Sequence, residues 1–367
     1  MQIKLLKKLQ RLLNKVMTKS KQNLLNFTLQ ELEEIVTTNN LKPFLAKQIF
    51  EWIYKKRVSS FDEMTNVSKV NIEFLKTNFY FCELKLKLKQ TDKFDETTKF
   101  LFELEDGNLI ETVLMKFEYG YSVCVTTQVG CNMGCKFCAS GLLKKKRNLL
   151  PCEIVGQIYT VQKYLDSNNL NQRVSNIVVM GIGEPFDNFE NLIKFIKIIN
   201  NDFGLQIGAR KITVSTCGLV NKFTEWAKLM PQIGLAISLH APNNDIRSKI
   251  MPINKAFNIG TLISAAKDYI RSTNRRITFE YIMLKDINDS IECAIELANL
   301  LKDVLCYVNL IPYNPVNEHS YKRSNNVINF ANKLSSLGIQ VTIRQEKGTN
   351  IDAACGQLRA KNEQKFI

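Results

Sequence analysis

Long hydrophobic runs are missing from this sequence: no apolar stretch approaches the roughly 18 residues that a membrane-spanning helix needs. The Lys-rich start, residues 1–21, also lacks the apolar segment and the small-residue cleavage site of a secretory signal. These absences exclude a membrane protein and a secreted protein from the expected classes. We therefore expect a cytoplasmic protein without a membrane partner, with an organellar targeting segment as the minor alternative.

Histidine is scarce, and acidic residues are unevenly spread. The chain has two histidines against ten cysteines, and its first 30 residues carry seven Lys or Arg and no Asp or Glu. The net charge of +15 and the pI of about 9.3 favour a polyanionic partner such as nucleic acid over an ordinary basic enzyme. Because cytoplasmic thiols stay reduced, the cysteines are expected to be ligands, catalysts or core residues rather than a disulfide framework.

The pattern along the chain predicts an α/β protein with appendages. Residues 1–88 are expected to form a basic helical accessory domain that binds RNA, 89–120 a β-hairpin extension, 121–348 a partial barrel, and 349–367 a C-terminal segment. In the helical part, Thr28 and Glu31 form a capping-box pattern. Asp106-Gly107-Asn108 marks the turn of the hairpin.

From residue 122 onward, strand patterns alternate with helix patterns. Strands are expected at 122–129, 175–181, 211–216, 233–239, 276–284 and 307–312, with a last extended piece at 339–345. Helices are expected at 151–165, 187–200, 220–229, 258–271, 289–303 and 324–337. Asp187 and Glu190 are expected to cap the second of these helices. Six successive βα units predict a parallel sheet covered by helices, and because eight would complete a barrel, we expect a splayed (βα)6 partial barrel.

Unusual residues follow the expected strand ends. Cys131 follows the first strand, and residues 181–185, 215–218, 238–242 and 313–315 follow the second, third, fourth and sixth. In α/β barrels, ligands bind at the rim formed by the carboxyl ends of the strands. The sequence therefore predicts a ligand site on one rim, and this clustering favours a barrel over a flat sheet.

The sharpest signal is Cys131-Asn-Met-Gly-Cys135-Lys-Phe-Cys138, three thiols on a loop that leaves a strand. Three thiolates can hold three corners of a [4Fe–4S] cube, and no fourth cysteine follows at the spacing of a ferredoxin. One iron would then be open to a small molecule. A zinc site of three thiolates and His240 is the alternative, although C-x3-C-x2-C differs from the C-x2-C pairs usual for zinc. Three packed core thiols are the least favoured interpretation.

This cysteine spacing resembles that of the radical S-adenosylmethionine superfamily. The resemblance implies one [4Fe–4S] cluster, whose open iron the methionyl group of S-adenosylmethionine chelates, and the partial barrel of that superfamily. Gly183 and Glu184, in Gly181-Ile-Gly-Glu-Pro185, are similar to the segment that contacts the methionyl amino group in the superfamily. The cofactor would supply the difficult chemistry, and the protein would position and shield it.

Several further segments are similar to the RlmN-type RNA adenine C2-methyltransferases, and they cover nearly the whole chain beyond about residue 22. They are Phe61-Asp-Glu-Met-Thr65, Val125-Thr-Thr-Gln-Val-Gly-Cys131, Val178-Val-Met-Gly-Ile-Gly-Glu-Pro185, Leu235-Ala-Ile-Ser-Leu-His-Ala-Pro242, Leu310-Ile-Pro-Tyr-Asn-Pro315 and Asp352-Ala-Ala-Cys-Gly-Gln-Leu358. The resemblance implies conversion of adenosine to 2-methyladenosine in the peptidyl transferase centre of 23S rRNA and beside the anticodon of some tRNAs. It also implies two S-adenosylmethionine molecules per turnover.

The same resemblance assigns roles to individual residues. Cys355 would accept a methyl group and then link covalently to RNA, Glu111 would accept the C2 proton, and Cys124 would attack Cys355 to form a disulfide and free the product. The cofactor contacts that it implies are Gly183, Glu184, Ser215, Ser238, Leu239, His240 and Asn314.

The substrate base must be splayed or flipped out of its stack to expose C2. The basic run Lys144, Lys145, Lys146 and Arg147, a few residues beyond Cys138, is a candidate phosphate clamp. Expected partners of the monomer are 23S rRNA, tRNA and an electron donor such as flavodoxin or ferredoxin. The alternatives are a Cfr-type enzyme that methylates adenine C8, a non-catalytic zinc-stabilised RNA-binding protein, and an electron-transfer protein, which the missing fourth cluster ligand disfavours.

Overall fold

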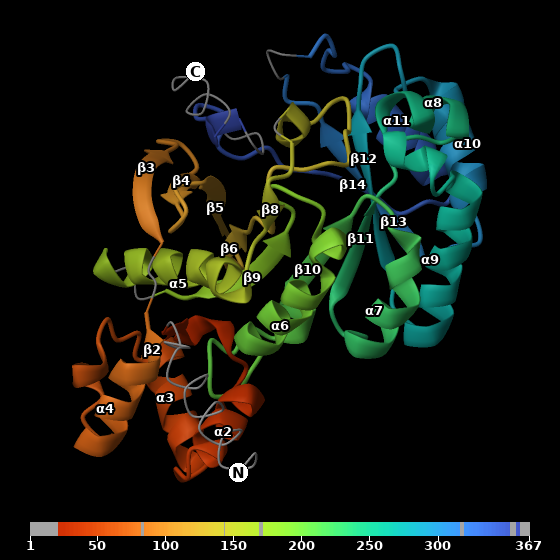
Figure 1. Cartoon of the computed structure of the whole chain (residues 1–367). Helices are drawn as coiled ribbons and strands as arrows, with labels where there is room; N and C mark the ends of the chain where they lie inside the picture. Colours follow the sequence, from red (N-terminus) through yellow and green to blue (C-terminus); the bar gives the residue numbers. More distant parts are fainter. Residues whose placement is uncertain are drawn as a thin grey trace, which may run out of the picture.

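The computed structural model describes residues 21–81, 84–142, 144–168, 172–315, 319–352 and 357–359. Its main feature is a sheet of ten strands in the order β14-β13-β12-β11-β10-β9-β6-β5-β4-β3 (Figure 1). The seven strands of its parallel part are β6 (Gly120–Cys124), β9 (Val174–Val179), β10 (Ile212–Thr216), β11 (Gly234–Ser238), β12 (Ile277–Met283), β13 (Cys306–Pro312) and β14 (Val341–Ile343). The prediction of six βα units followed by a last extended piece is confirmed.

Helices follow the parallel strands and cover the outer face of the sheet (Figure 1). They are α5 (Pro151–Ser167), α6 (Phe189–Ile199), α7 (Phe223–Leu229), α8 (Asn244–Ile250), α9 (Ile259–Thr273), α10 (Ile291–Leu301) and α11 (Val327–Ser336). Every residue of β12 is buried, as expected for a parallel strand that is covered on both faces. Helix α8 was not predicted from the sequence, and it lies directly after the rim segment that follows β11.

The predicted hairpin is confirmed. Strands β4 (Thr98–Glu103) and β5 (Leu109–Phe117) pair antiparallel, and Gly107 has a positive φ of 78° in the turn between them. Strand β5 also pairs with β6, so the hairpin extends the barrel sheet instead of forming a separate layer. An unpredicted strand, β3 (Lys85–Thr91), adds to the outer edge, and its alternating lysines are typical of a protected edge strand.

Short helices form the N-terminal part, below α5 in Figure 1. They are η1 (Leu24–Asn26), α2 (Leu29–Thr38), α3 (Phe44–Tyr54), η2 (Phe61–Glu63) and α4 (Lys69–Asn78), with a small pair of strands, β1 (Gln22–Asn23) and β2 (Phe79–Tyr80). The capping box of Thr28 and Glu31 is confirmed at the start of α2. Across the described ranges, no helix is long and apolar enough to cross a membrane.

Two local predictions were wrong. The strand expected at 122–129 ends at Cys124, and Gln128–Val129 instead forms β7, which pairs with β8 (Arg147–Asn148) beside the cysteine loop. Asp187 does not cap α6: the N-cap is Asn188, without a side-chain hydrogen bond. The Asp187 carboxylate is instead engaged by Lys145 and Gln128, because the short helix η4 (Pro185–Asn188) turns it toward them.

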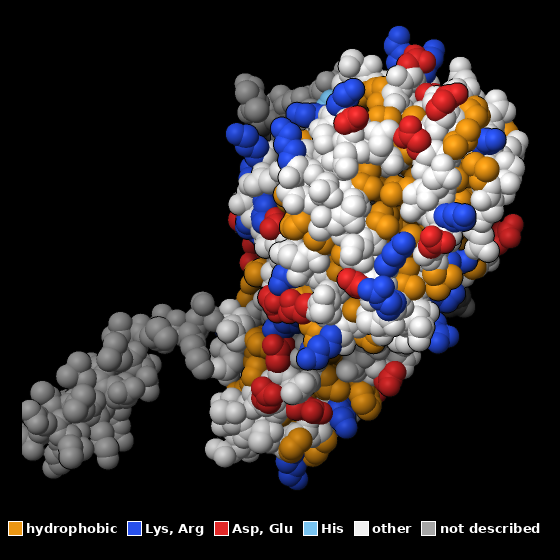
Figure 2. Space-filling model, turned by 90° about the vertical axis from the view of Figure 1, so that its right-hand side faces the viewer, with side chains coloured by type: hydrophobic (Ala, Val, Ile, Leu, Met, Phe, Trp, Pro, Cys, Tyr) orange, Lys and Arg blue, Asp and Glu red, His pale blue; other side chains and the backbone are white. Residues whose placement is uncertain are grey.

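Charge on the visible face in Figure 2 is mixed, with Lys and Arg side chains interspersed among Asp and Glu. The basic excess of the chain is therefore not gathered into one patch on this face. Salt bridges between neighbouring elements account for part of the mixing, such as Lys194 of α6 with Glu31 of α2 at 2.7 Å.

Candidate active site on the barrel rim

The segment between β9 and η4 turns sharply at two glycines. A Cβ at Gly181 would lie 2.6 Å from the main-chain oxygen of Val125, and one at Gly183 would lie 2.6 Å from Cβ of Gln128. Gly183 also has a positive φ of 107°. Only glycine fits at both positions. The main chain of the Gly-Ile-Gly-Glu motif therefore passes close to neighbouring residues, and this close packing fixes the position of Glu184.

Glu184 is a buried carboxylate held at the rim. Its Oε1 accepts from the main-chain N–H of Phe186 at 3.0 Å, and its Oε2 accepts from that of Cys217 at 2.7 Å. Burial raises the pKa of this carboxyl group, and the two N–H donors oppose that effect. The carboxylate thus joins the end of β9 to the end of β10, where it can accept a further donor such as an ammonium group.

The ends of β10 and β11 bring Ser215 and Ser238 to the same rim, with Leu239 and His240 following. His240 has a positive φ of 57°, and its Nδ1 accepts from the main-chain N–H of Ile282 at 3.0 Å. Burial lowers its pKa to about 3, so the ring is neutral at physiological pH. Within the described structure, the ring therefore ties the end of β11 to β12.

The three cysteines lie on the loop between β7 and β8, each partly exposed. The loop is folded by main-chain bonds, such as that from the N–H of Cys138 to the oxygen of Cys135 at 3.3 Å. Burial raises the pKa of Cys131 to about 11 and also raises that of Cys135. The thiols of Cys131 and Cys135 are therefore protonated in the absence of metal at neutral pH, and binding of a metal centre there would release protons.

The shape of this loop bears on which metal centre fits it. Across the described ranges, no three Cys, His, Asp or Glu side chains converge as they would around one metal ion. A zinc site here would need a fourth ligand beside the three thiolates, and His240, the candidate, already uses Nδ1 in the fold. In a [4Fe–4S] cube each thiolate binds a different iron, and the three thiols on this one loop can supply three such ligands.

A second polar centre lies on the hairpin. Lys99 of β4 has no exposed side-chain surface, and its Nζ lies 2.9 Å from Oε2 of Glu111 on β5. The same Nζ donates to the main-chain oxygen of Asp352 at 2.5 Å. Oε1 of Glu111 accepts from the main-chain N–H of Arg359 at 2.6 Å. A buried ion pair thus joins the hairpin to the C-terminal segment.

Further contacts dock that segment on the hairpin sheet. Asp92 accepts from the main-chain N–H of Asn350 at 2.9 Å, and Gln90 exchanges two 3.1 Å hydrogen bonds with Asp352. Leu358 packs between hairpin leucines. Residues 353–356, with the predicted nucleophile Cys355, lie outside the described residues, but both flanks of that position are held beside Glu111.

Cys124 ends β6 and is buried. It is paired in register with Val113, two residues from Glu111 on β5, and Thr126 donates to the main-chain oxygen of Glu111 at 2.6 Å. Residues that are far apart in the sequence, Cys124, Glu111 and the C-terminal flanks, are therefore neighbours. Asn314 lies on the exposed segment just after β13.

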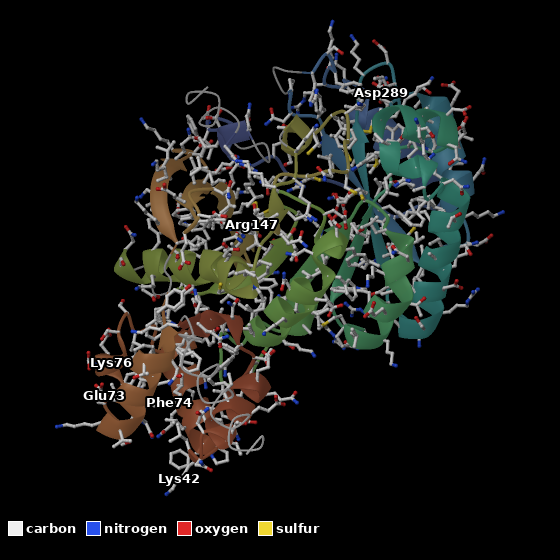
Figure 3. All side chains as sticks on the ribbon, in the orientation of Figure 1. Lys42, Glu73, Phe74, Lys76, Arg147 and Asp289 are labelled. Carbon is white, nitrogen blue, oxygen red and sulfur yellow. The ribbon has the colours of Figure 1, made fainter. Side chains whose placement is uncertain are left out.

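The basic run divides into two kinds of residue. Arg147 makes bonds of 2.7 Å to each oxygen of Glu153 and a 2.6 Å bond to Asp106 in the hairpin turn, at the centre of the molecule in Figure 3. Lys145 binds Asp187 at 2.7 Å. Lys144 and Lys146 are exposed, and the ammonium group of Lys146 donates to the neutral side-chain amide of Asn108. Those two lysines are thus the members of the run best placed to meet a phosphate.

Sequence comparison decides the family. A protein from Malacoplasma penetrans, described as a probable dual-specificity RNA methyltransferase RlmN, is 59% identical over 92% of this chain and 95% of its own length. A protein of the same description from Bacillus velezensis is 58% identical over 92% of this chain and 93% of its own. The chain belongs to the RlmN family of RNA methyltransferases.

Family models and a solved structure agree with membership of the RlmN family. The model for the ribosomal RNA large subunit methyltransferase N-terminal domain matches residues 22–80, and that for the radical SAM superfamily matches residues 125–298. The crystal structure of a radical SAM methyltransferase from Sphaerobacter thermophilus is 41% identical, with a TM-score of 0.86, over 92% of this chain and 98% of that one. The fold is therefore the radical SAM fold, with the RlmN N-terminal domain before it.

Membership of the RlmN family implies S-adenosylmethionine and an iron–sulfur cluster, and the residues described above fit both. Cys131, Cys135 and Cys138 would hold the cluster, and the strand-end residues Glu184, Ser215 and Ser238 would lie on the rim where the cofactor binds. When bound, these groups supply a radical that can take a hydrogen atom from an unactivated methyl group.

Some residues of the RlmN-family site were not predicted from the sequence. Gln128, fully buried, accepts from the main-chain N–H of Glu184 at 2.8 Å and fixes the glycine turn. Lys99 and Arg247 are likewise buried charges with structural partners at the site. For Lys99 there was a signal, since a lysine within the apolar strand Thr-Lys-Phe-Leu-Phe is unusual. For Gln128 there was none beyond its place beside Cys131.

Proposed function

We propose that this protein methylates C2 of adenosine in RNA, with 23S rRNA and tRNA as substrates. Its relatives are named as dual-specificity RNA methyltransferases. One observation supports methylation at C2 through a cysteine intermediate. Glu111, the strand end with Cys124, and both flanks of the Cys355 position lie together on one hairpin sheet. A simple methyl transfer from a sulfonium to a nucleophilic atom would need neither two thiols nor a buried carboxylate there.

Each side chain has a defined step in this proposal. The Cys355 thiolate takes the methyl group of one S-adenosylmethionine and becomes a thioether, and S-adenosylhomocysteine leaves. Once that methyl has lost a hydrogen atom to the radical that the bound cofactor would supply, its carbon can bond to C2, which links Cys355 covalently to RNA, and the surplus electron would return to the cluster. Glu111 then accepts the C2 proton at a carboxylate oxygen that the protein already orients. Finally the Cys124 thiolate attacks the sulfur of Cys355, so a disulfide forms and the carbon–sulfur bond breaks. The released carbon takes a proton and becomes the methyl group of the product, and an external thiol reductant restores the two cysteines.

Several elements of this proposal concern binding. Gly183, Glu184, Ser215, Ser238, Leu239, His240 and Asn314 would contact S-adenosylmethionine. Because His240 is neutral and its Nδ1 is engaged, we expect its main chain rather than its ring to face the cofactor. Lys144 and Lys146 would bind phosphates near the cluster loop. A monomer that receives electrons from a flavodoxin or ferredoxin, in a cytoplasmic setting, completes the proposal.

The test is a Cys124→Ala variant produced in cells. Without the resolving thiol, the protein should carry an RNA adduct on Cys355, detectable as nuclease-trimmed nucleotide mass on the peptide that contains it. Cys152→Ala is the matched control, since Cys152 is also a buried cysteine but lies on α5, and it should be free of adduct. Clean, RNA-free Cys124→Ala protein would contradict the roles of both thiols.

The Cfr-type alternative differs only in the carbon that is methylated. The match of residues 22–80 to the RlmN N-terminal domain favours C2. Nucleosides from RNA treated with the enzyme, compared by mass spectrometry with 2-methyladenosine and 8-methyladenosine standards, distinguish the two. Product with the retention time of the C8 isomer alone would overturn the proposal.

A further inference from the structure

Arg247 is a fully buried arginine beneath the rim. It belongs to α8, and its guanidinium donates to the main-chain oxygens of Cys217 at 2.8 Å, Leu239 at 3.1 Å and Ser238 at 3.2 Å. The first of these lies just past β10, and the other two lie at the end of β11. One side chain therefore fixes the two strand ends that carry Ser215 and Ser238.

The remaining N–H groups of Arg247 donate to residues that follow α8 in the chain. They reach Oδ1 of Asn254 at 3.0 Å and the main-chain oxygen of Phe257 at 3.3 Å. All of these acceptors are neutral, and no carboxylate of the described residues forms an ion pair with this guanidinium. Burial lowers the pKa of Arg247 to about 10, which still leaves it charged at neutral pH. A buried cation balanced only by neutral acceptors is costly, so it calls for a functional explanation.

The cysteine loop rests on the last residue of α8 and on the residues that directly follow it. The main-chain N–H of Lys136 donates to the oxygen of Ile250 at 2.9 Å, and a Cβ at Gly134 would lie 3.6 Å from Pro252. Cys135 packs on the apolar cluster that contains Ile250 and Met251. The same cluster contains Cys217, whose main-chain oxygen accepts from Arg247. The positive charge therefore lies under the loop that would carry three thiolates.

We propose that Arg247 is a positioning residue for the iron–sulfur centre: its hydrogen bonds hold the rim in place, and its charge balances that of the thiolate-bound cluster. The inference rests on the cluster of the proposed function, but not on the identity of the RNA product. A positive charge beside an anionic cluster stabilises the reduced form more than the oxidised form and so raises the reduction potential.

The test compares Arg247→Met, Arg247→Lys and Arg247→Gln with Lys249→Met, a control that removes an exposed charge from the same helix. Each protein is reconstituted anaerobically with iron and sulfide. The iron retained against a chelator is then measured, together with the cluster potential from a redox titration followed by electron paramagnetic resonance. Loss of groups that support metal ligands typically costs about 10–100-fold in affinity, and we expect a loss of that size for Arg247→Met. Its potential should also become more negative.

The charge and the hydrogen bonds can be separated. Arg247→Lys should keep a potential near that of the wild type while it retains less iron, whereas Arg247→Gln should be shifted to a more negative potential. Lys249→Met should match the wild type in both measurements. If Arg247→Met does not fold, the Lys and Gln pair decides the question, and equal potentials in those two variants overturn the proposal. Wild-type iron retention and potential in Arg247→Met also overturn it. Neither measurement uses RNA, so a failure of adenine C2 methylation would be seen separately, in the nucleoside products.

Discussion

At the scale of single residues, the site depends on charges that the fold buries. Lys99 and Glu111 form an ion pair with almost no exposed surface, and each also binds the main chain of the C-terminal segment. Removing one partner of such a pair leaves the other buried and uncompensated, which commonly costs about 3–5 kcal/mol. The same carboxylate thus has a structural role and a proposed chemical one, and a double substitution can separate them.

We expect Glu111→Gln to lower the free energy of unfolding by about 3–5 kcal/mol, because the Lys99 ammonium loses its counter-ion. Product formation should fall by about 100-fold or more, the usual effect of losing a general base. Denaturant unfolding and the yield of 2-methyladenosine are the measurements. The double variant Glu111→Gln/Lys99→Met should recover much of the stability and remain inactive. Recovery of product along with stability would show that Glu111 is only structural.

At the scale of elements, the hairpin and α5 are joined by Arg147, which binds Asp106 and Glu153 together. The bond to Arg147 holds the pKa of Asp106 down, at about 2 instead of 3.8. A lowered carboxyl pKa stabilises the folded protein above the unfolded-state pKa, and that stabilisation is lost as the pH falls through the folded-state value. Arg147 is thus a structural link between elements, while Lys144 and Lys146 remain exposed.

Arg147→Met should therefore lower the free energy of unfolding by roughly 1–2 kcal/mol at neutral pH, since two partly exposed charged contacts are lost. The difference from the wild type should shrink between about pH 4 and pH 2, where Asp106 becomes protonated. Thermal denaturation across this pH range is the measurement. A difference that is independent of pH would mean that the bond to Asp106 contributes little.

The double variant Lys144→Ala/Lys146→Ala should behave in the opposite way to Arg147→Met. Stability should be close to that of the wild type because both side chains are exposed, but RNA binding should weaken, and its dependence on salt should flatten as fewer counterions are released. Arg147→Met serves as the control, with an unchanged salt slope. Equal slopes for the double lysine variant and the wild type would refute the phosphate clamp.

At the scale of the whole molecule, the N-terminal helices and the barrel share one apolar core. The core residues run without interruption from Leu24 through Phe50 and Phe79 to the barrel strands. Polar contacts cross the same boundary, including the hydroxyl of Tyr159 on α5 with the main-chain oxygen of Val58 at 2.8 Å. The stability of the barrel therefore depends on its contacts with the N-terminal part.

A chain that starts at residue 84 should accordingly unfold at a lower temperature or aggregate, because it would expose the apolar face of α5. A chain that starts at residue 21 keeps all the described core and should unfold like the full-length protein. The shorter deletion removes six Lys or Arg residues and should still reduce the salt dependence of RNA binding. Calorimetry of the three chains is the measurement, and equal melting temperatures for all three would contradict the shared core.

The sequence by itself determined the order of the βα units, the hairpin turn and the family, because these depend on local periodicity and on short motifs such as the cysteine loop. Neither α8 nor β3 was predicted from the sequence. Helix α8 is only seven residues long, and β3 is an edge strand in which lysines alternate with other residues. The sequence also misassigned Asp187, whose partners come from the cysteine loop and from β7.

Only the tertiary structure decided which charges meet. Lys99 contacts both Glu111 and Asp352, and Asp352 is 253 residues away from it in the sequence. No local pattern signals such a pairing. The same holds for Arg247, whose acceptors lie at the ends of two other elements. The physical reason is that a buried charge is tolerated only where the complete fold supplies its partners, and those partners are fixed by strand order and register rather than by neighbouring residues.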